Sequence, residues 1–426
     1  MSREMKDSGI EWIGEIPEDW KISQIGQMYV ERREKVSDKD FIPLSVTMNG
    51  ILLQLSSAAK TEAHDDRKLV KQGDFVINSR SDRRGSCGIS KYNGSVSLIN
   101  IVLRPNENIE SSYYDWLFHS TVFSNEFYKW GHGIVDDLWT TKWQDMKKIS
   151  VPVPTMSEQK KIADYLCMKC EMIENVLKKT KATVEKYRNL KQSIITEVVT
   201  KGLKNNRLMK ESELGWTQII PNDWNIVKIK HIGKTSSGTT PMRSKDIDYF
   251  KEATIRWVRT LDLNDWLVND SSEKITERAL ENSSCSIMPK NTVCVAMYGG
   301  SGTIGKCGIL TKESATNQAI CSIVCNEEKI VPMYLLFQLL ALKKYWMYYA
   351  VGTRKDPNIS QDIVGKMKVL LPSLDEQNEI VNYLAKKCAE IDKVIEKKEQ
   401  FVNELGTYKR SLIYEYVTGK KEVSES

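Results

Sequence analysis

The chain has 426 residues, of which 41% are hydrophobic and 28% are charged, and its formal net charge is +6 at pH 7. This length suffices for two or three domains with their own cores, and the small basic excess permits a polyanionic partner without requiring one. No run of 18 apolar residues occurs and the first residues lack the apolar core of a signal peptide, so we expect a cytoplasmic protein with no membrane partner.

The nine cysteines are scattered and odd in number, which is typical of a reducing compartment rather than of a disulfide framework. The pair Cys167-Met-Lys-Cys170 is a candidate metal or redox motif, but it falls within a predicted helix and no second pair follows. The four histidines are not spaced as metal ligands either. We therefore expect no metal site, and we assign these thiols to helix packing.

Each half of the chain begins with the same short motifs. Met5-Lys-Asp-Ser8, Trp12, Ile16-Pro17 and Asp19-Trp20 are matched, 204 residues later, by Met209-Lys-Glu-Ser212, Trp216, Ile220-Pro221 and Asp223-Trp224. Self-similarity at this scale predicts two homologous halves.

Short β-branched runs bounded by Gly and Asn predict strands in both halves. In the first half they lie at Gly73–Asn78 and Ser95–Leu103, before a predicted helix at Tyr113–Trp130. In the second half the corresponding segments are Asn291–Tyr298, Ala319–Cys325 and Met333–Tyr349. Each region is therefore expected to be α+β, with a mostly antiparallel or mixed sheet.

A long helical segment follows each α+β region, and the two copies are 218 residues apart. Ser157 and Asp375 are suited to cap the helix starts, and Glu158-Gln159 and Glu376-Gln377 follow them. The apolar stripes predict two helices that pack on each other, although Lys169, Lys191, Lys387 and Lys409 interrupt them. The residues assigned to this packing are Ile162, Leu166, Ile173, Val176, Ile380, Leu384, Ile391 and Val394.

The resulting fold class is α+β, with two pseudo-repeated domains separated by two long antiparallel helices that form a coiled-coil-like spacer. The expected boundaries are 1–152 for the first domain, 153–207 for the central helix and linker, 208–370 for the second domain, and 371–426 for the C-terminal helix.

Two motifs resemble catalytic or nucleotide-binding motifs, but each lacks residues that its function requires. Gly300-Ser-Gly-Thr-Ile-Gly305-Lys306 matches part of a phosphate-binding loop, but Cys307 replaces the magnesium-binding hydroxyl and the following residues predict a turn and a strand. A Gly-rich hairpin tip, repeated at Gly85-Ser-Cys-Gly88, is the better interpretation. Asp356-Pro-Asn-Ile359 resembles the Asp-Pro-Pro-Tyr box of adenine methyltransferases, but it lacks the aromatic residue that stacks on a flipped base. We therefore expect no catalytic centre.

Basic and polar residues in the loops of both regions suit contacts to phosphates and base edges, although a solvated charged surface would show the same residue types. The candidate DNA-binding residues are Arg80, Arg83, Arg84, Thr239, Arg243, Arg259, Tyr298, Lys306, Arg354 and Lys355.

This organisation resembles the DNA-specificity subunit of a type I restriction–modification system. The Pro-x-Asp-Trp segments, the Glu-Gln helix starts and Ser237-Gly-Thr-Thr-Pro241 followed by Ile255-Arg-Trp-Val258 carry the resemblance, which covers essentially the whole chain. The first region lacks the Gly-Thr-Thr-Pro pattern and has Phe41-Ile-Pro-Leu-Ser-Val-Thr-Met-Asn-Gly50 instead, which suggests that the two domains read different half-sites.

The resemblance implies a non-catalytic prokaryotic protein with two target-recognition domains. Each domain would read one half of a bipartite double-stranded DNA target, and the helices would set the spacer. Two modification subunits would bring S-adenosylmethionine and the adenine-methylating site, and restriction subunits would bring ATP and magnesium, so no cofactor is expected on this chain. The alternatives are a methyltransferase or nuclease that acts alone, and a coiled-coil scaffold that binds proteins.

Overall fold

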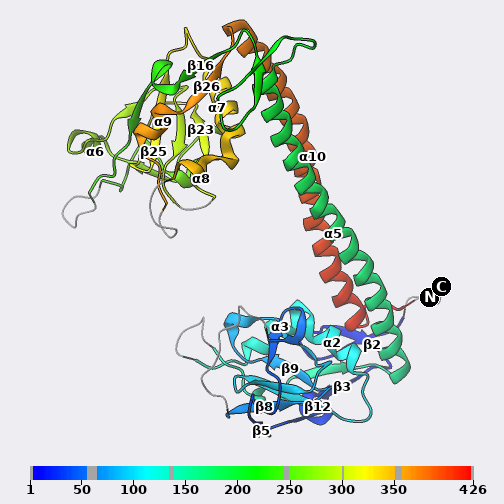
Figure 1. Cartoon of the computed structure of the whole chain (residues 1–426). Coiled ribbons are helices and arrows are strands. Elements are labelled where there is room, and N and C mark those ends of the chain that lie inside the picture. Colours follow the sequence, from blue (N-terminus) through cyan, green and yellow to red (C-terminus); the bar gives the residue numbers. More distant parts are fainter. Residues whose placement is uncertain are drawn as a thin grey trace. The chain divides into compact units, whose positions relative to one another are not determined.

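The computed structural model describes residues 3–54, 65–133, 139–242, 249–299, 302–350 and 357–423 (Figure 1). Its contacts divide the chain into two compact units. The first unit comprises Met1–Lys181 and Glu399–Ser426, and the second comprises Ala182–Lys398. Each of the two long helices, α5 (Met156–Lys201) and α10 (Leu374–Val417), therefore contributes one part to each unit.

Both units are built on the same antiparallel sheet, which confirms the predicted α+β class. In the first unit the strand order is β10-β9-β12-β4, and in the second it is β23-β22-β25-β17 with β19 added in parallel beside β23. The register is equivalent, since Cys87 pairs with Ile77 in one unit and Cys307 pairs with Val295 in the other. The bounds are β4 Tyr29–Glu31, β9 Phe75–Asn78, β10 Cys87–Ile89, β12 Asn100–Pro105, β17 Gly233–Ser237, β19 Trp266–Val268, β22 Val293–Ala296, β23 Cys307–Leu310 and β25 Ile320–Cys325.

Matching hairpins and short helices surround the two sheets. Helices α2 and α3 follow β12, and α7 and α8 follow β25. The strands and helices of the first unit are β1 Met5–Asp7, β2 Glu15–Pro17, β3 Lys21–Gln24, α1 Ile25–Met28, α2 Ser111–His119, α3 Thr121–Lys129, α4 Trp143–Met146 and β13 Ser150–Val153. Their counterparts are β14 Met209–Glu211, β15 Ile219–Pro221, β16 Asn225–Lys228, η3 Ile229–His231, α7 Pro332–Ala341, η5 Leu342–Lys344, α8 Trp346–Tyr349, α9 Gln361–Lys366 and β26 Lys368–Leu371.

The units differ in the segment that joins the edge strand to the central hairpin. Between β4 and β9 the first unit has residues 32–74, and the corresponding residues 236–292 of the second unit are 14 longer, which accounts for the change of offset from 204 to 218. The first segment forms β5 Lys35–Val36, β6 Leu44–Thr47, β7 Gly50–Leu53 and β8 Arg67–Val70, with β11 Gly94–Ser97 beside β8. The second forms β18 Ile255–Val258, η4 Thr260–Asp262, β20 Glu273–Ile275, α6 Glu277–Glu281 and β21 Ile287–Met288, with β24 Ser314–Thr316 beside β18.

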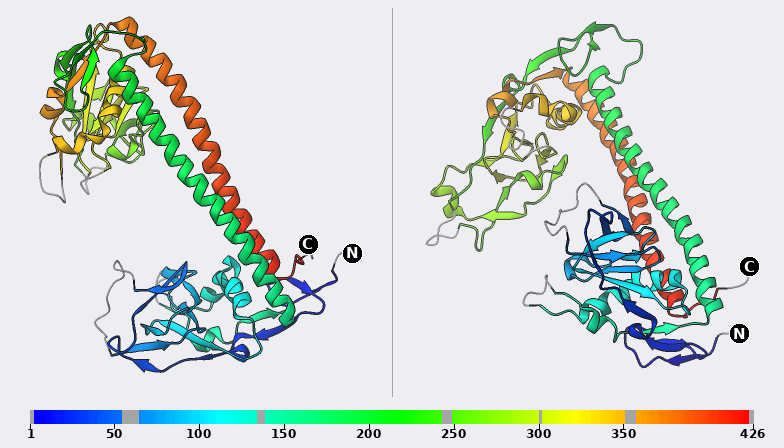
Figure 2. Two further views of the ribbon diagram at one scale, coloured as in Figure 1. Left: turned by 45° about the vertical axis from the view of Figure 1, so that its right-hand side comes forward. Right: turned by 60° about the horizontal axis from the view of Figure 1, so that its bottom comes forward.

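Helices α5 and α10 pack against each other, antiparallel, as expected (Figure 2). In the first unit, Ile162, Leu166 and Ile173 share a core with residues near the end of α10, namely Leu412, Ile413 and Tyr416. In the second unit, the early α10 residues Ile380 and Leu384 share a core with residues near the end of α5, namely Ile195, Val198 and Val199. Ile391 packs with Val184.

Two of the assigned packing residues lie off the seam. Val176 is 42% exposed and Val394 is half-buried, whereas their neighbours Leu177 and Ile395 are each 9% exposed. The buried positions follow a 4-4-3-4 spacing in both helices because they keep to one side of a helix with 3.6 residues per turn. The stripes are Ile162, Leu166, Cys170, Ile173 and Leu177, and Ile380, Leu384, Cys388, Ile391 and Ile395, so one thiol of each helix packs in the seam.

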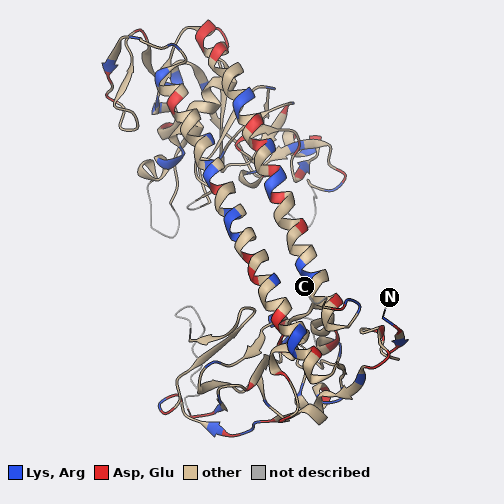
Figure 3. Ribbon diagram, turned by 90° about the vertical axis from the view of Figure 1, so that its right-hand side faces the viewer, with Lys and Arg blue, Asp and Glu red and all other residues tan. Residues whose placement is uncertain are grey.

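Charged residues lie along both long helices (Figure 3). Two of the interrupting lysines form ion pairs across the seam. Lys191 lies 2.7 Å from Asp392 in the second unit, and Lys409 lies 2.5 Å from Glu174 in the first. The members of the two pairs are 218 residues apart, so the ion pairs are repeat-equivalent.

None of the helices described by the structure is long and apolar enough to cross a membrane.

Candidate nucleic-acid interface

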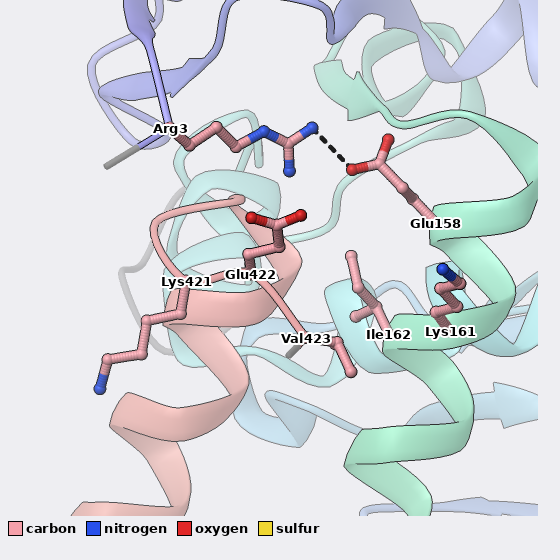
Figure 4. Close-up of a pocket in the computed structure, with 7 residues that line it drawn as sticks. All are labelled: Arg3, Glu158, Lys161, Ile162, Lys421, Glu422 and Val423. Atoms are coloured by element: carbon pink, nitrogen blue, oxygen red, sulfur yellow. Dashed lines mark hydrogen bonds and ion pairs between the residues drawn. The ribbon is translucent and has the colours of Figure 1, made fainter. Parts of the chain in front are cut away.

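The Asp-Trp and Glu-Gln motifs meet in the first unit around one arginine. Arg3 Nη2 lies 2.8 Å from Asp19 and 2.6 Å from Glu158, its guanidinium lies 5.5 Å from the centre of the Trp20 ring, and Trp20 Nε1 donates to Glu158 at 3.3 Å. Figure 4 shows Arg3 reaching the Glu158 carboxylate beside the pocket that Ile162 and residues 421–423 help to line. Gln159 donates to the Pro154 carbonyl and accepts from the backbone amide of Glu110. The Glu and Gln side chains thus fasten α5 to the α+β region.

The second unit repeats this arrangement with more burial. Arg207 contacts Asp223 at 2.5 Å and Glu376 at 2.9 Å, and Trp224 Nε1 donates to Glu376 at 3.1 Å. The Glu376 side chain is 6% exposed, whereas that of Glu158 is 24% exposed. Burial by itself would raise the pKa of Glu376, but the hydrogen bonds from Arg207 and Trp224 outweigh it and leave this pKa below its ordinary value. The arginines were missing from the sequence prediction, although they keep the 204-residue offset.

The β9–β10 hairpin tip carries the three candidate arginines of the first unit. Arg80 and Arg83 flank Asp82, at 3.1 Å and 3.8 Å, and the Arg83 side chain is 68% exposed. Arg84 lies over the Tyr128 ring at 5.5 Å, and the Tyr128 hydroxyl donates to the carbonyls of Asn78 and Arg83. The backbone of the tip is therefore held by Tyr128 of α3, while Arg83 and Arg84 are exposed and Arg80 is half-buried.

The β22–β23 hairpin tip of the second unit carries Tyr298 and Lys306. Tyr298 is 39% exposed, and Lys306 is half-buried. Gly305 has a φ of +78° and lies so close to Trp346 of α8 that an added Cβ would come within 2.2 Å of the ring. Because β23 begins at Cys307 where a phosphate-binding loop would start a helix, the hairpin interpretation is confirmed.

The remaining candidates differ in their availability. Arg259 is held by Glu273 at 2.9 Å and Ser272 at 2.8 Å, so its terminal nitrogens are engaged within the unit. Thr239 is part of the backbone frame: its carbonyl accepts from the Trp257 indole at 3.0 Å. That bond joins the Gly-Thr-Thr-Pro and Ile-Arg-Trp-Val segments. Arg243, Arg354 and Lys355 lie outside the described residues.

The structure gives the buried thiols a packing role. Burial raises the pKa of Cys294 and of Cys321 to about 12, so neither is a nucleophile at neutral pH. Among the residues that the structure describes, no group of three or more His, Cys, Asp or Glu side chains is placed to hold a metal ion.

Two segments of the chain, residues 17–186 and 221–402, match the family model of the type I restriction modification DNA specificity domain. The chain belongs to this family. It is a DNA-specificity subunit of a type I restriction–modification system, a non-catalytic component that gives the enzyme its selectivity. The two matches start 204 residues apart, as do the two Pro-x-Asp-Trp segments.

Full-length and partial relatives agree with this assignment. The specificity subunit is 23% identical to the MjaVIII specificity subunit of Methanocaldococcus jannaschii, over 96% of this chain and 94% of the relative. It is 24% identical to the EcoR124I/EcoR124II specificity subunit of Escherichia coli, over 66% and 64% of the two chains.

Solved structures show the same fold. A chain of a type I restriction–modification system, solved to explain complex assembly and conformational transition, is similar to this specificity subunit with a TM-score of 0.73 at 13% identity, over 95% of this chain and 99% of that one. The HsdS subunit of Thermoanaerobacter tengcongensis gives a TM-score of 0.50 at 15% identity, over 95% and 98%.

Proposed function

We propose that each α+β region of this specificity subunit reads one half of a bipartite double-stranded DNA target. The observation that carries the proposal is the repeated frame: both units have the same four-stranded sheet and the same fastened hairpin tip, but different side chains at the tip and different segments before β9 and β22. Two regions that read different half-sites need this combination of a common scaffold and distinct surface chemistry.

Helices α5 and α10 are proposed to set the unread spacer between the half-sites. They have 46 and 44 residues, which at a rise of 1.5 Å per residue corresponds to roughly 69 and 66 Å. Two turns of B-DNA are about 68 Å long, so helices of this length suit two contacts about two turns apart.

Chemistry is proposed to come from partners. Two modification subunits would carry S-adenosylmethionine and methylate an adenine in each half-site, and restriction subunits would use ATP and magnesium for translocation and cleavage. The family assignment supports this division, and the complex is proposed to act in a prokaryotic cytoplasm.

Two of the tip arginines, Arg83 and Arg84, are proposed to contact DNA phosphates. Arg83 and Arg84 are exposed on a backbone that Tyr128 holds. Because this loop is already ordered, little conformational entropy of the loop is lost when DNA binds to the two arginines. In the assembled complex, Arg83→Ala with Arg84→Ala should weaken binding to all sequences alike and lower the slope of log K against log salt by about 2. An unchanged slope would make them surface charges.

An exchange of domains tests the function itself. Residues 208–370 are replaced by those of another specificity subunit, the complex is assembled with modification subunits, and methylated adenines are mapped by sequencing. One half-site should change while the other half-site and the spacer persist, and exchange of residues 1–152 should give the converse. Retention of both half-sites would contradict the proposal. Methyl transfer by the chain alone would favour an enzyme, and the lack of a DNA footprint by the complex would favour a protein scaffold.

A further inference from the structure

Each hairpin tip is joined to a second loop by one isolated β-bridge, and the two bridges are repeat-equivalent. Arg80 pairs with Thr140 in the first unit, and Tyr298 pairs with Asn358 in the second. Both members are shifted by 218 residues. The sequence prediction included Arg80 and Tyr298 but not their partners Thr140 and Asn358.

The hydrogen bonds around the two bridges are equivalent as well. In the first unit the Thr141 amide donates to the Ser79 carbonyl at 3.0 Å, and in the second the Ile359 amide donates to the Met297 carbonyl at 2.9 Å. A third loop supports each tip from the other side, through Ser79 N to Ile99 O at 3.3 Å and Met297 N to Ala319 O at 2.7 Å. The same backbone thus holds the bridged residues in both units.

This geometry places the two bridged side chains next to each other. Arg80 and Thr140 lie between the hydrogen bonds Thr141 N to Ser79 O and Ser81 N to Trp139 O, so they form a non-hydrogen-bonded antiparallel pair. In such a pair both side chains point to the same face, with Cα atoms about 4.5 Å apart. The Arg80 side chain and Tyr298 are each 39% exposed, and Asn358 is exposed.

The side chains differ completely while the frame does not. Arginine and threonine occupy the bridge of the first unit, and tyrosine and asparagine occupy that of the second. The DNA phosphates are the same for every base sequence, so contacts to them give no reason for the bridged residues to differ between the two units. Base contacts give such a reason, because two half-sites of different sequence need different donors and acceptors.

We propose that the bridged pairs Arg80–Thr140 and Tyr298–Asn358 read base edges in the DNA major groove, one pair for each half-site. Arginine presents a fork of donors that matches the two acceptors of guanine, and asparagine matches the donor and acceptor of adenine. The exposed ion pair between Arg80 and Asp82 is weak and can yield to a base. Asn358 is exposed, so its side-chain amide is accessible to DNA. This inference rests on the proposed function.

The test uses the complete complex with its modification subunits and DNA duplexes in which each base pair of the mapped target is replaced in turn. Base preferences are compared at one fixed salt concentration, and the affinity for the unaltered target is also measured over a series of salt concentrations. Asn358→Ala should reduce the preference at one base pair of the half-site read by the second unit by about 5- to 150-fold, and leave the other half-site unchanged. Arg80→Ala should do the same in the other half-site. Tyr298→Phe, which removes only a hydroxyl group, should alter preference at or beside the base pair affected by Asn358→Ala.

Lys290→Ala is the matched control. Lys290 is an exposed residue of the same unit that lies just before the start of β22, whereas the hairpin tip follows the end of β22. It should leave every base preference as it is. Unchanged preferences in the Asn358 and Arg80 variants would overturn the inference, and so would an equal loss of affinity for all duplexes with a lowered salt slope, which is the mark of phosphate contacts. If domain exchange fails to move one half-site, the proposed function is wrong; if it succeeds and these variants keep the wild-type preferences, only the inference is wrong.

Discussion

The first and second units hold their hairpin tips with equivalent strands, but they support those tips with different residues. In the first unit the tip lies against Tyr128, and the core beneath it is a chain of aromatic contacts that includes Phe75, Phe118 and Phe123. In the second unit the tip lies against Trp346, over a largely aliphatic core from α7. The position of the tip is therefore common to both units, while the packing that secures it is not. A domain that must keep one geometry and vary its surface can repack its core as long as the strand register stays fixed.

Substitution of the tip glycines should give the largest difference in stability between the two units. Gly85 and Gly305 both have positive φ, +74° and +78°, but an added Cβ at Gly85 meets nothing within 4 Å whereas at Gly305 it would overlap Trp346. Gly85→Ala should therefore cost only the left-handed backbone strain, about 1–2 kcal/mol. Gly305→Ala adds the displacement of a buried indole and should cost about 3–5 kcal/mol in total.

Hydrogen exchange of the full-length protein, followed by mass spectrometry of peptides from each unit, measures the two effects separately, because unfolding of a chain with two units is not a single transition. Peptides of β22, β23 and α8 should lose protection in Gly305→Ala, and β9 and β10 should change little in Gly85→Ala. Equal losses in the two variants would show that the Trp346 contact does not secure the tip.

Much of the frame could be predicted from the sequence because it is duplicated. The offsets of 204 and 218 identify the two halves, and the α+β class, the hairpin at Cys307 and the antiparallel helices are confirmed. In the predicted seam, Val176 is exposed, and Val394 is half-buried beside the more deeply buried Ile395. Because Leu177 and Ile395 are apolar as well, only the 4-4-3-4 spacing through Cys170 and Cys388 distinguishes each residue from its neighbour.

The interface was harder to predict because its residues are joined by tertiary contacts alone. Thr140 and Asn358 are ordinary polar residues in loops, and only the bridge to the tip marks them. Arg259 shows the converse: it looks like a DNA ligand, but Glu273 and Ser272 hold it within the unit. The composition of the loops indicates a binding surface. Which of its polar side chains are already bound within the unit depends on contacts with residues that are distant in sequence.

The Asp-Trp and Glu-Gln clusters around Glu158 and Glu376 also differ between the two units, with a smaller expected effect on stability. Glu158 and Glu376 accept from the same kinds of donor, an arginine and a tryptophan, but Glu376 is more deeply buried. Glu376→Gln keeps the shape of the side chain and removes its charge, so it should cost about 2–3 kcal/mol at pH 7, because hydrogen bonds to a buried charged group are the stronger ones. Glu158→Gln should cost about 1 kcal/mol, since water competes for its partners.

The dependence of this difference on pH follows from the lowered pKa of Glu376. A carboxyl whose pKa is lower in the folded state than in the unfolded state stabilises the fold fully above its unfolded value of about 4.5, and that stabilisation is lost as the pH falls through the folded value. Glutamine does not titrate. The stability gap between the wild-type protein and Glu376→Gln, measured as protection of the β15 and β16 peptides, should therefore be constant from pH 7 to about pH 5 and close below that. A gap that widened on acidification would mean that the charge of Glu376 destabilises the second unit, and that Arg207 and Trp224 hold the neutral acid instead.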